Sequence, residues 1–211
     1  MLLISDHSIE SASPWVLRFL PLIPKNHGPV LDLASGAGRH TRLLLNAGYE
    51  VWSLDKDASL LAPLTSLGAR CFQFDLESGD DADVSHIDLP FELETFSAII
   101  VTNYLYRPIL SRLMALLKEN GVLIYETFAI GNEAFGRPKN PDFLLRPGEL
   151  LQHFLSNPVP DRAGHCIAYE HGMIESPKPA LVQRICVRSV SVSTDAAPLQ
   201  TIGDQLNANC L

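Results

Sequence analysis

Short apolar runs alternate with amphipathic segments along most of this chain. The amphipathic segments predict helices over residues 13–20, 41–48, 57–67 and 108–118, and another that begins at 147. The first helix has a start signal, since Ser13 can cap it and Pro14 suits its first turn. The apolar runs are typical of strands buried in a parallel sheet, and they span residues 30–33, 49–54, 69–74, 96–101 and 122–128.

Two further strand-like runs, around residues 166–174 and 180–190, have no helix between them and should pair antiparallel. The pattern therefore predicts a single α/β domain over residues 1–190. We expect a Rossmann-like, doubly wound and mostly parallel seven-stranded sheet, with an antiparallel last strand and helices on both faces. Three less regular parts complete this prediction: an N-terminal helical segment over the site (1–29), an acid-rich solvated connection (77–94) and a flexible tail (191–211).

The composition narrows the functional classes. Of 211 residues, 46% are hydrophobic and 19% charged, as in a soluble globular protein, and the net charge of −8 argues against a broad nucleic-acid footprint. No apolar run is long enough to span a bilayer, and the N-terminus does not resemble a signal peptide. The four cysteines show no Cys-x-x-Cys pattern and the seven histidines no His-x-x-x-His pattern. These features predict a cytoplasmic protein without a membrane partner or a metal.

The stretch from Val30 to Asp55 carries the candidate chemistry. It predicts a strand, a turn containing Gly36 and Gly38, a helix and a second strand that ends at Asp55. The small turn residues let a ligand approach the backbone, and the free N–H groups of the helix N-terminus face it. Asp55 is placed to accept hydrogen bonds from both hydroxyls of a ribose. An adenosine-containing cofactor is therefore expected.

Two residues argue against NAD as that cofactor. The third small residue of the dinucleotide fingerprint is replaced by Thr41, which suits tight packing and the approach of a pyrophosphate less well. Asp32, directly before the turn, would repel a pyrophosphate and would suit a cofactor that carries an amino group or a positive charge.

The same residues resemble class I S-adenosylmethionine-dependent methyltransferases. Residues 30–38 are similar to the family's first motif, with Ala34 in place of its first glycine. In this resemblance Asp55 matches the ribose-binding acid, and Asp75 matches the acid that meets the adenine amino group. The resemblance covers about residues 13–190. It also places Asn103 and Tyr104 beside the methionine end and the methyl group.

Within the family, residues 38–41 and the loop over 126–150 resemble a bacterial subgroup related to tellurite-resistance-type methyltransferases. The expected activity is methyl transfer from S-adenosylmethionine to a small-molecule acceptor. The residues expected to bind the cofactor are Asp32, Ala34, Ser35, Gly36, Gly38, Arg39, His40, Asp55, Lys56, Asp75, Leu76, Asn103 and Tyr104.

Candidate catalytic residues lie after the fourth and fifth strands, at the edge where open α/β sheets bind ligands. Tyr104 could line the methyl-transfer site, and Glu126 could act as a base or orient a substrate. Each candidate also has a structural alternative, such as a cap or a buried hydrogen-bonded acid. The residues considered for substrate binding are Trp15, Tyr106, Arg107, Phe135 and Arg137.

Two other classes of function are compatible with the sequence. An NAD(P)-binding oxidoreductase would use the same strand–turn–helix unit. A non-catalytic adenosine-cofactor-binding protein needs no catalytic base. The acceptor and the oligomeric state are open from the sequence.

Overall fold

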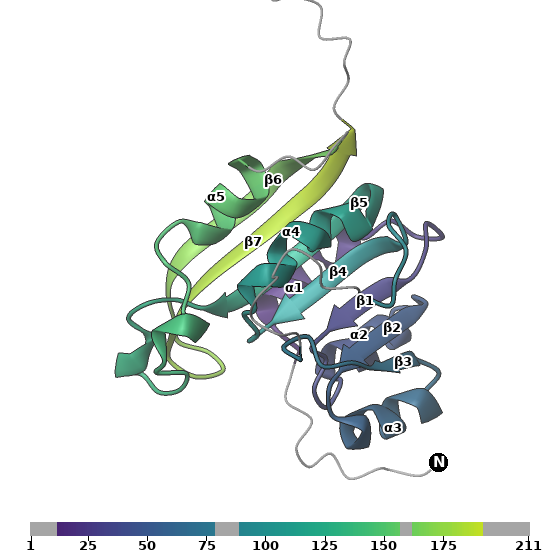
Figure 1. Ribbon diagram of the computed structural model, residues 1–211, viewed down its shortest axis with the longest axis horizontal. Coiled ribbons are helices and arrows are strands. Elements are labelled where there is room, and N and C mark those ends of the chain that lie inside the picture. The colour runs from purple at the N-terminus through teal and green to yellow at the C-terminus, as the bar shows by residue number, and fades with distance from the viewer. Residues whose placement is uncertain (1–11, 79–88, 157–161, 192–211) are drawn as a thin grey trace, which may run out of the picture.

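Seven strands form one sheet in the order β3-β2-β1-β4-β5-β7-β6 in the computed structural model (Figure 1). The structure describes residues 12–78, 89–156 and 162–191. The strands are β1 (Val30–Leu33), β2 (Val51–Asp55), β3 (Arg70–Gln73), β4 (Phe96–Thr102), β5 (Leu117–Phe128), β6 (Arg162–Ile174) and β7 (Ala180–Ser191).

Strands β1 to β5 pair in parallel, and β7 runs antiparallel to both of its neighbours, β5 and β6. The predicted sheet, with a single reversed strand among seven, is therefore confirmed. Because the first four strands are parallel, their carboxyl ends meet at one edge of the sheet. The helical elements are α1 (Pro14–Phe19), η1 (Leu20–Leu22), α2 (Arg39–Asn46), α3 (Ala58–Ser66), α4 (Arg107–Leu116), η2 (Asn132–Ala134), η3 (Pro141–Phe143) and α5 (Glu149–Ser156).

Alternate residues of the central strands point to opposite faces of the sheet and meet different helices. In β1, Val30 belongs to an apolar cluster with residues of α1 and α2, whereas its neighbour Leu31 belongs to a cluster with residues of α4 and α5. Ile100 and Ile99 divide in the same way in β4. Both faces of the sheet are therefore covered, which explains why these strands are mostly apolar.

Several element boundaries differ from the prediction. The helix expected over 108–118 ends at Leu116, and β5 already begins at Leu117, which pairs with Phe96. Asn120 has a φ of 63° and lies within the strand. Pairing with β4 decided this boundary, and such a contact is not visible in the local pattern.

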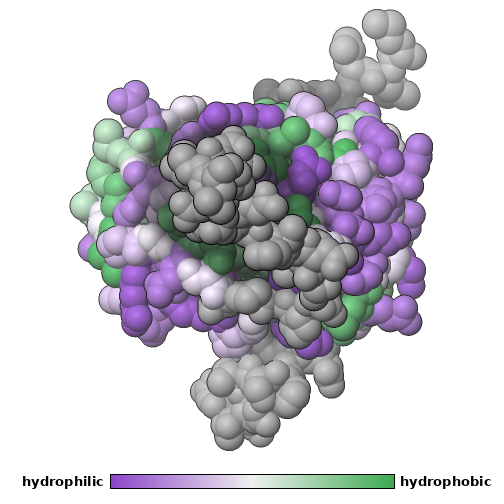
Figure 2. All heavy atoms as spheres, turned by 90° about the horizontal axis from the view of Figure 1, so that it is seen from above, coloured by the Kyte–Doolittle hydropathy of each residue, from purple (hydrophilic) through white to green (hydrophobic). Residues whose placement is uncertain are grey.

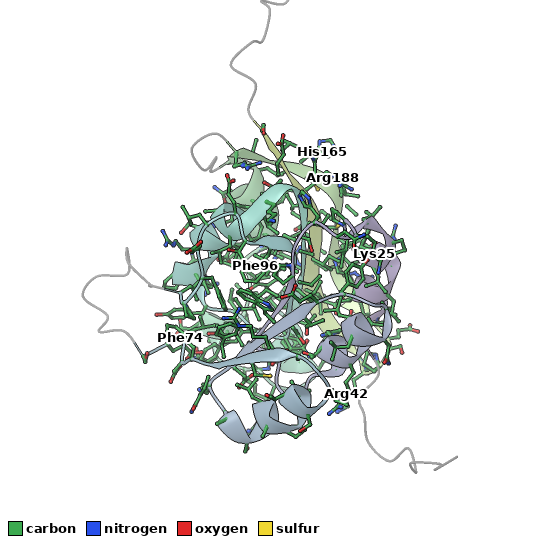
Figure 3. All side chains as sticks on the ribbon, turned by 90° about the vertical axis from the view of Figure 1, so that its right-hand side faces the viewer. Lys25, Arg42, Phe74, Phe96, His165 and Arg188 are labelled. Carbon is green, nitrogen blue, oxygen red and sulfur yellow. The ribbon has the colours of Figure 1, made fainter. Side chains whose placement is uncertain are left out.

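Parts of three predicted segments lie outside the described residues: 1–11 of the N-terminal segment, 79–88 of the acid-rich connection and 192–211 of the expected tail. Within the described residues, no helix is long and apolar enough to cross a membrane. Hydrophilic and hydrophobic side chains are interspersed on the face in Figure 2. In Figure 3, Phe96 lies in the interior, whereas Lys25 and Arg188 lie near the periphery.

Candidate functional site

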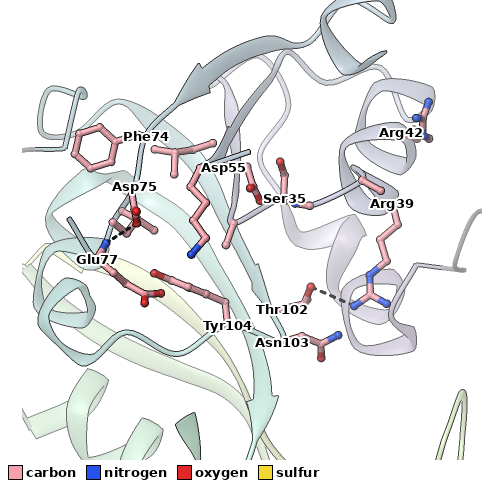
Figure 4. A pocket seen from close by; sticks show the side chains of 16 residues that line it. Ser35, Arg39, Arg42, Asp55, Phe74, Asp75, Glu77, Thr102, Asn103 and Tyr104 are labelled. Carbon is pink, nitrogen blue, oxygen red and sulfur yellow. Dashed lines mark hydrogen bonds between the residues drawn. The ribbon is translucent and has the colours of Figure 1, made fainter. Parts of the chain in front are cut away.

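The carboxyl ends of β1 to β4 enclose a cavity of about 610 Å³, which we call the first cavity (Figure 4). It lies at the edge of the sheet where parallel α/β folds bind their ligands. Its lining consists of residues 34–37, Arg39, Arg42, residues 54–56, residues 74–77 and residues 102–104. Three of these residues carry acids and three carry cations, so the charge of the lining is balanced.

The turn between β1 and α2 exposes its backbone to this cavity. Ala34, Gly36 and Gly38 all have positive φ, at 54°, 53° and 77°. A Cβ added to Gly36 would meet nothing within 4 Å, whereas one added to Gly38 would lie 2.3 Å from a methyl carbon of Leu64. Gly36 therefore leaves open space beside the cavity, and Gly38 allows α2 to begin against α3.

Asp55 connects the end of β2 to this turn. Its Oδ2 accepts a 2.7 Å hydrogen bond from the backbone N–H of Gly36, and its Oδ1 accepts a 3.0 Å bond from the N–H of Asp57. Asp57 caps α3 through the N–H of Ser59. The carboxylate of Asp55 is thus held at the cavity wall, and its oxygens retain lone pairs for further donors.

Ser35 provides a polar group without a partner at the same wall. Its side chain is buried, and its hydroxyl oxygen has no hydrogen-bond partner among the described residues. Ser35 also lines the first cavity. A buried hydroxyl without a partner is costly, so this group suits a polar ligand.

Asp32 lies beneath the turn and does not line the first cavity. Only 2% of the residue is exposed, and its Oδ2 accepts a 2.6 Å hydrogen bond from the hydroxyl of Thr41. Burial raises the pKa of Asp32 to about 7, although the hydrogen bonds from Thr41 oppose that shift. Asp32 therefore stabilises the turn by connecting β1 to the start of α2.

His40 follows Arg39 in α2 but faces the protein interior. Its Nε2 accepts a 3.1 Å hydrogen bond from the N–H of Ser13, and its Nδ1 lies 3.3 Å from the hydroxyl of Thr102. Burial, with help from the nearby Arg39, lowers the pKa of His40 to about 3. The imidazole is therefore neutral and links the start of α1 to the end of β4.

Tyr104 lies across the first cavity from the turn. Its carbonyl oxygen accepts a 2.8 Å hydrogen bond from the hydroxyl of the buried Tyr125. Burial raises the pKa of the Tyr104 hydroxyl, and the carboxylate of Glu77 raises it further. Tyr104 therefore stays protonated at neutral pH and is a hydrogen-bond donor here, not a proton acceptor.

A second cavity of about 680 Å³ adjoins the first, because Arg39 and Asn103 line both. Its walls come from the start of α1, the end of β5, the loop after β5 and the turn between β6 and β7. These segments are distant in the sequence. Buried apolar and exposed aromatic side chains form part of the lining, among them Phe128, Phe135 and Val182.

Glu126 forms a chain of polar contacts at one wall of the second cavity. Its Oε1 accepts a 2.7 Å hydrogen bond from the hydroxyl of Ser13, and its Oε2 lies 3.1 Å from Nη1 of Arg184. Arg184 also pairs with Glu170, and its guanidinium lies over the ring of Trp15. These contacts bind α1 to β5, β6 and β7.

Of the five residues considered for substrate binding, some line the second cavity and others do not. Phe135 and Arg137 line the second cavity. Trp15 is 1% exposed and donates its indole N–H to the carbonyl of Ile185, so it lies under the second cavity and not in its lining. Tyr106 and Arg107 line neither cavity. Arg107 instead pairs with Glu149 at 2.6 Å.

Some lining residues were not among the candidates. Glu77, Thr102 and Arg42 line the first cavity, and Lys178 and Arg184 line the second. Glu77 and Thr102 lie next to Asp75 and Asn103, so extending each strand-end motif by a residue or two would have found them. Lys178 and Arg184 carry no local signal. No group of three metal-binding side chains occurs among the described residues.

No protein-family model matches the chain, and no curated protein matches it in sequence. Solved structures do match it. TehB from Haemophilus influenzae has a TM-score of 0.59 and 17% identity over 82% of this chain, which spans only 60% of the TehB chain.

Two methyltransferase structures match over more of their own length. A SAM-dependent methyltransferase from Methanosarcina mazei has a TM-score of 0.58 and 13% identity, over 87% of this chain and 100% of that one. An S-adenosylmethionine-dependent methyltransferase from Mesorhizobium loti has a TM-score of 0.52 and 14% identity, over 82% and 96%. The chain therefore has the fold of S-adenosylmethionine-dependent methyltransferases.

Proposed function

We propose that the protein is an S-adenosylmethionine-dependent methyltransferase whose acceptor is a small molecule. The observation that carries this proposal is the adjacency of the two cavities, which meet at Arg39 and Asn103. The first cavity has the size and balanced charge for a cofactor, and the second offers a separate space for an acceptor. Methyltransferases from Methanosarcina mazei and Mesorhizobium loti, which share the fold, belong to the same class of enzyme.

The residues of the first cavity fit the cofactor's parts. The carboxylate of Asp55 would accept hydrogen bonds from the ribose hydroxyls, and Asp75 would accept one from the adenine amino group. The hydroxyl of Ser35, without a partner among the described residues, would bind a polar group near the turn. Asn103 and Tyr104 would lie beside the methionine end, since Asn103 also reaches the second cavity.

The bound cofactor would supply an activated methyl group, so the protein's main task is to orient an acceptor next to it. Neither catalytic candidate has the properties of a strong general base. Tyr104 holds its proton at neutral pH, and both oxygens of Glu126 already accept hydrogen bonds, from Ser13 and Arg184. We assign Glu126 and Trp15 the role of positioning Arg184 beside the second cavity. His40 would position Thr102 in the same indirect way.

One contact favours this function over that of an NAD(P)-binding oxidoreductase. In dinucleotide-binding turns, backbone N–H groups and the helix N-terminus face a pyrophosphate. Here the N–H of Gly36 donates to Asp55 instead. That N–H is therefore engaged and does not face a pyrophosphate.

Calorimetry with S-adenosylhomocysteine tests the proposal. We expect binding by the natural protein and at least about tenfold weaker binding by Asp55→Ala, because hydrogen bonds to a charged group are worth about 1.5–3 kcal/mol. Asp57→Ala is the matched control: it removes the cap of α3 but does not touch the first cavity. Natural protein that binds NADH and not S-adenosylhomocysteine would disprove the proposal. Methyl transfer from labelled cofactor to an extract component would separate an enzyme from a non-catalytic binding protein.

A further inference from the structure

The second cavity is cationic in a protein that is acidic overall. Among the described residues, four cations line it, namely Arg39, Arg137, Lys178 and Arg184, against one carboxylate, that of Glu126. The chain carries a net charge of −8. A cation-lined cavity in such a chain concentrates anions locally, because low-dielectric walls focus the field of the lining charges.

The four cations are not equivalent. Arg184 is already neutralised by Glu126 and Glu170, and Arg39 donates a 3.3 Å hydrogen bond to Thr102. The side chains of Arg137 and Lys178, by contrast, have no ion-pair or hydrogen-bond partner within the described part of the chain. They belong to different segments, the loop after β5 and the turn between β6 and β7, and both line the same cavity.

A buried amide holds this arrangement together. Asn132 is 1% exposed and lines the cavity. Its Oδ1 accepts a 3.1 Å hydrogen bond from the N–H of Leu181, near the start of β7, and its Nδ2 donates a 3.4 Å bond to the carbonyl of Arg137. The backbone of Arg137 is therefore fastened to the strand that follows the turn bearing Lys178.

Apolar residues make up much of the rest of the lining, together with the polar Ser13, Asn103, Asn132 and Ser176. Phe128 and Phe135 contribute aromatic surface, Ile174 and Val182 aliphatic surface, and Pro177 and Pro179 flank Lys178. Apolar walls with a few converging cations suit a ligand that has an apolar body and an anionic group. The volume of about 680 Å³ lies within the range of pockets that bind drug-sized ligands, and it is larger than an inorganic ion requires.

We infer that the second cavity binds a small organic anion, with a carboxylate or phosphate paired to Arg137 and Lys178 and an apolar body against Phe128 and Val182, and that this ligand is the methyl acceptor. The inference rests on the proposed function for the ligand's role as acceptor. The binding of the anion itself does not depend on that function.

Fluorine NMR with three matched probes tests the anion site: 4-(trifluoromethyl)benzoate, 4-(trifluoromethyl)phenyl phosphate and the neutral 4-(trifluoromethyl)benzamide. We expect saturable broadening for at least one anionic probe, at least about tenfold tighter binding than for the amide, and weaker binding as NaCl rises from about 50 to about 500 mM. The better of the two anions identifies the headgroup. Inorganic phosphate should compete poorly, because it lacks the apolar body.

The double variant Arg137→Gln plus Lys178→Gln should bind the anionic probe about tenfold more weakly, since each exposed ion pair contributes up to about 1 kcal/mol. Lys139→Gln is the matched control, because Lys139 is exposed in the same loop and does not line the cavity. Equal affinity for the anions and the amide, or anion affinity unchanged in the double variant, would overturn the inference.

Calorimetry with S-adenosylhomocysteine on the same samples separates the two proposals. Cofactor binding without an anion preference rejects the inference and leaves the proposed function intact. Anion binding without cofactor binding rejects the proposed function. The second cavity would then be an anion site but not the site of a methyl acceptor.

Discussion

The hydroxyl of Thr41 donates a 2.6 Å hydrogen bond to Oδ2 of Asp32, directly beneath the turn between β1 and α2. Its oxygen also lies 2.8 Å from the hydroxyl of Ser53. Since Thr41 has one proton to donate and gives it to Asp32, Ser53 must be the donor in the second bond. The three buried side chains thus connect β1, α2 and β2 below the first cavity.

Thr41→Val should lower the free energy of unfolding by roughly 1–3 kcal/mol, because it removes the hydroxyl that donates to Asp32 and leaves only the backbone hydrogen bond from residue 41. It should also raise the pKa of Asp32 further. Thr41→Ser keeps the hydroxyl and serves as the control, with a smaller loss from the missing methyl group. Urea unfolding at neutral pH measures both variants. Equal stability of the valine and serine variants would contradict a role for the hydrogen bond.

Asp32 and His40 should influence the pH dependence of stability in opposite directions. The pKa of Asp32 rises from 3.8 to about 7 on folding, so the folded state holds an extra proton between these values and stability falls as pH rises. The pKa of His40 falls from 6.5 to about 3, so the unfolded state holds the extra proton there and stability rises with pH. Between about pH 4 and 6.5 the two effects oppose each other.

Asp32→Asn should remove only the first of these effects. The stability of the variant relative to the natural protein should increase from pH 4 to 7, by at most about 1.4 kcal/mol per pH unit, and then level off. Urea unfolding of both proteins from pH 4 to pH 8 measures this difference, in which contributions from other groups cancel. A difference that does not change with pH would show that Asp32 titrates near its ordinary pKa.

Ala34→Gly should leave the protein as stable as before or stabilise it by up to about 1 kcal/mol. Ala34 has a φ of 54°, a conformation that costs a residue with a Cβ about 1–2 kcal/mol. Glycine avoids this strain, but it increases the conformational entropy of the unfolded chain, which lowers the free energy of unfolding by about 0.4–1 kcal/mol. Ala37→Gly, in the same turn but without a positive φ, is the control and should be destabilising. Thermal unfolding compares the two, and a less stable Ala34→Gly than Ala37→Gly would refute this account of the strain.

Gly36→Ala and Gly38→Ala should separate folding from binding. At Gly38 the new methyl group meets Leu64, so about 2–4 kcal/mol of stability should be lost through overpacking and strain. Combined with Leu64→Ala, the total loss should be smaller than the sum of the two single losses, because the clash is then relieved. At Gly36 there is open space, so the cost in stability should be only about 1–2 kcal/mol. Gly36→Ala should nevertheless weaken S-adenosylhomocysteine binding, as measured by calorimetry. Full affinity in Gly36→Ala would argue against a close approach of the cofactor to this backbone.

Arg107→Gln should affect stability but not the binding of the anionic probes. The guanidinium donates to Glu149 and to the carbonyls of Asp142 and Leu144, so it fastens the loop before α5 to the start of α4. We expect a loss of about 1–2 kcal/mol, because the pair is partly exposed. Arg107→Lys keeps the charge but not the fork of donors and should recover only part of the loss. Loss of probe binding in Arg107→Gln, at full stability, would restore Arg107 as a substrate residue.

The sheet and most of the first cavity could be predicted from local sequence patterns alone. Strand and helix periods are local, and the carboxyl ends of parallel strands must meet at one edge, so Asp55, Asp75 and Asn103 could be placed together from their positions after successive strands. Sequence position alone does not show which of two neighbouring helix residues faces the cavity, because consecutive side chains in a helix point about 100° apart. Arg39 therefore lines both cavities while His40 is buried beneath them.

The second cavity, by contrast, could not be predicted, because it depends on contacts between distant segments. It joins the start of α1, the end of β5, the loop after it and the turn before β7, through contacts such as Ser13 with Glu126 and Asn132 with Leu181. These pairs are 113 and 49 residues apart. No local pattern encodes such a contact, since it depends on the antiparallel pairing of β7 beside β5. Lys178 faces a cavity for that reason alone, and its own sequence surroundings are those of an ordinary exposed turn.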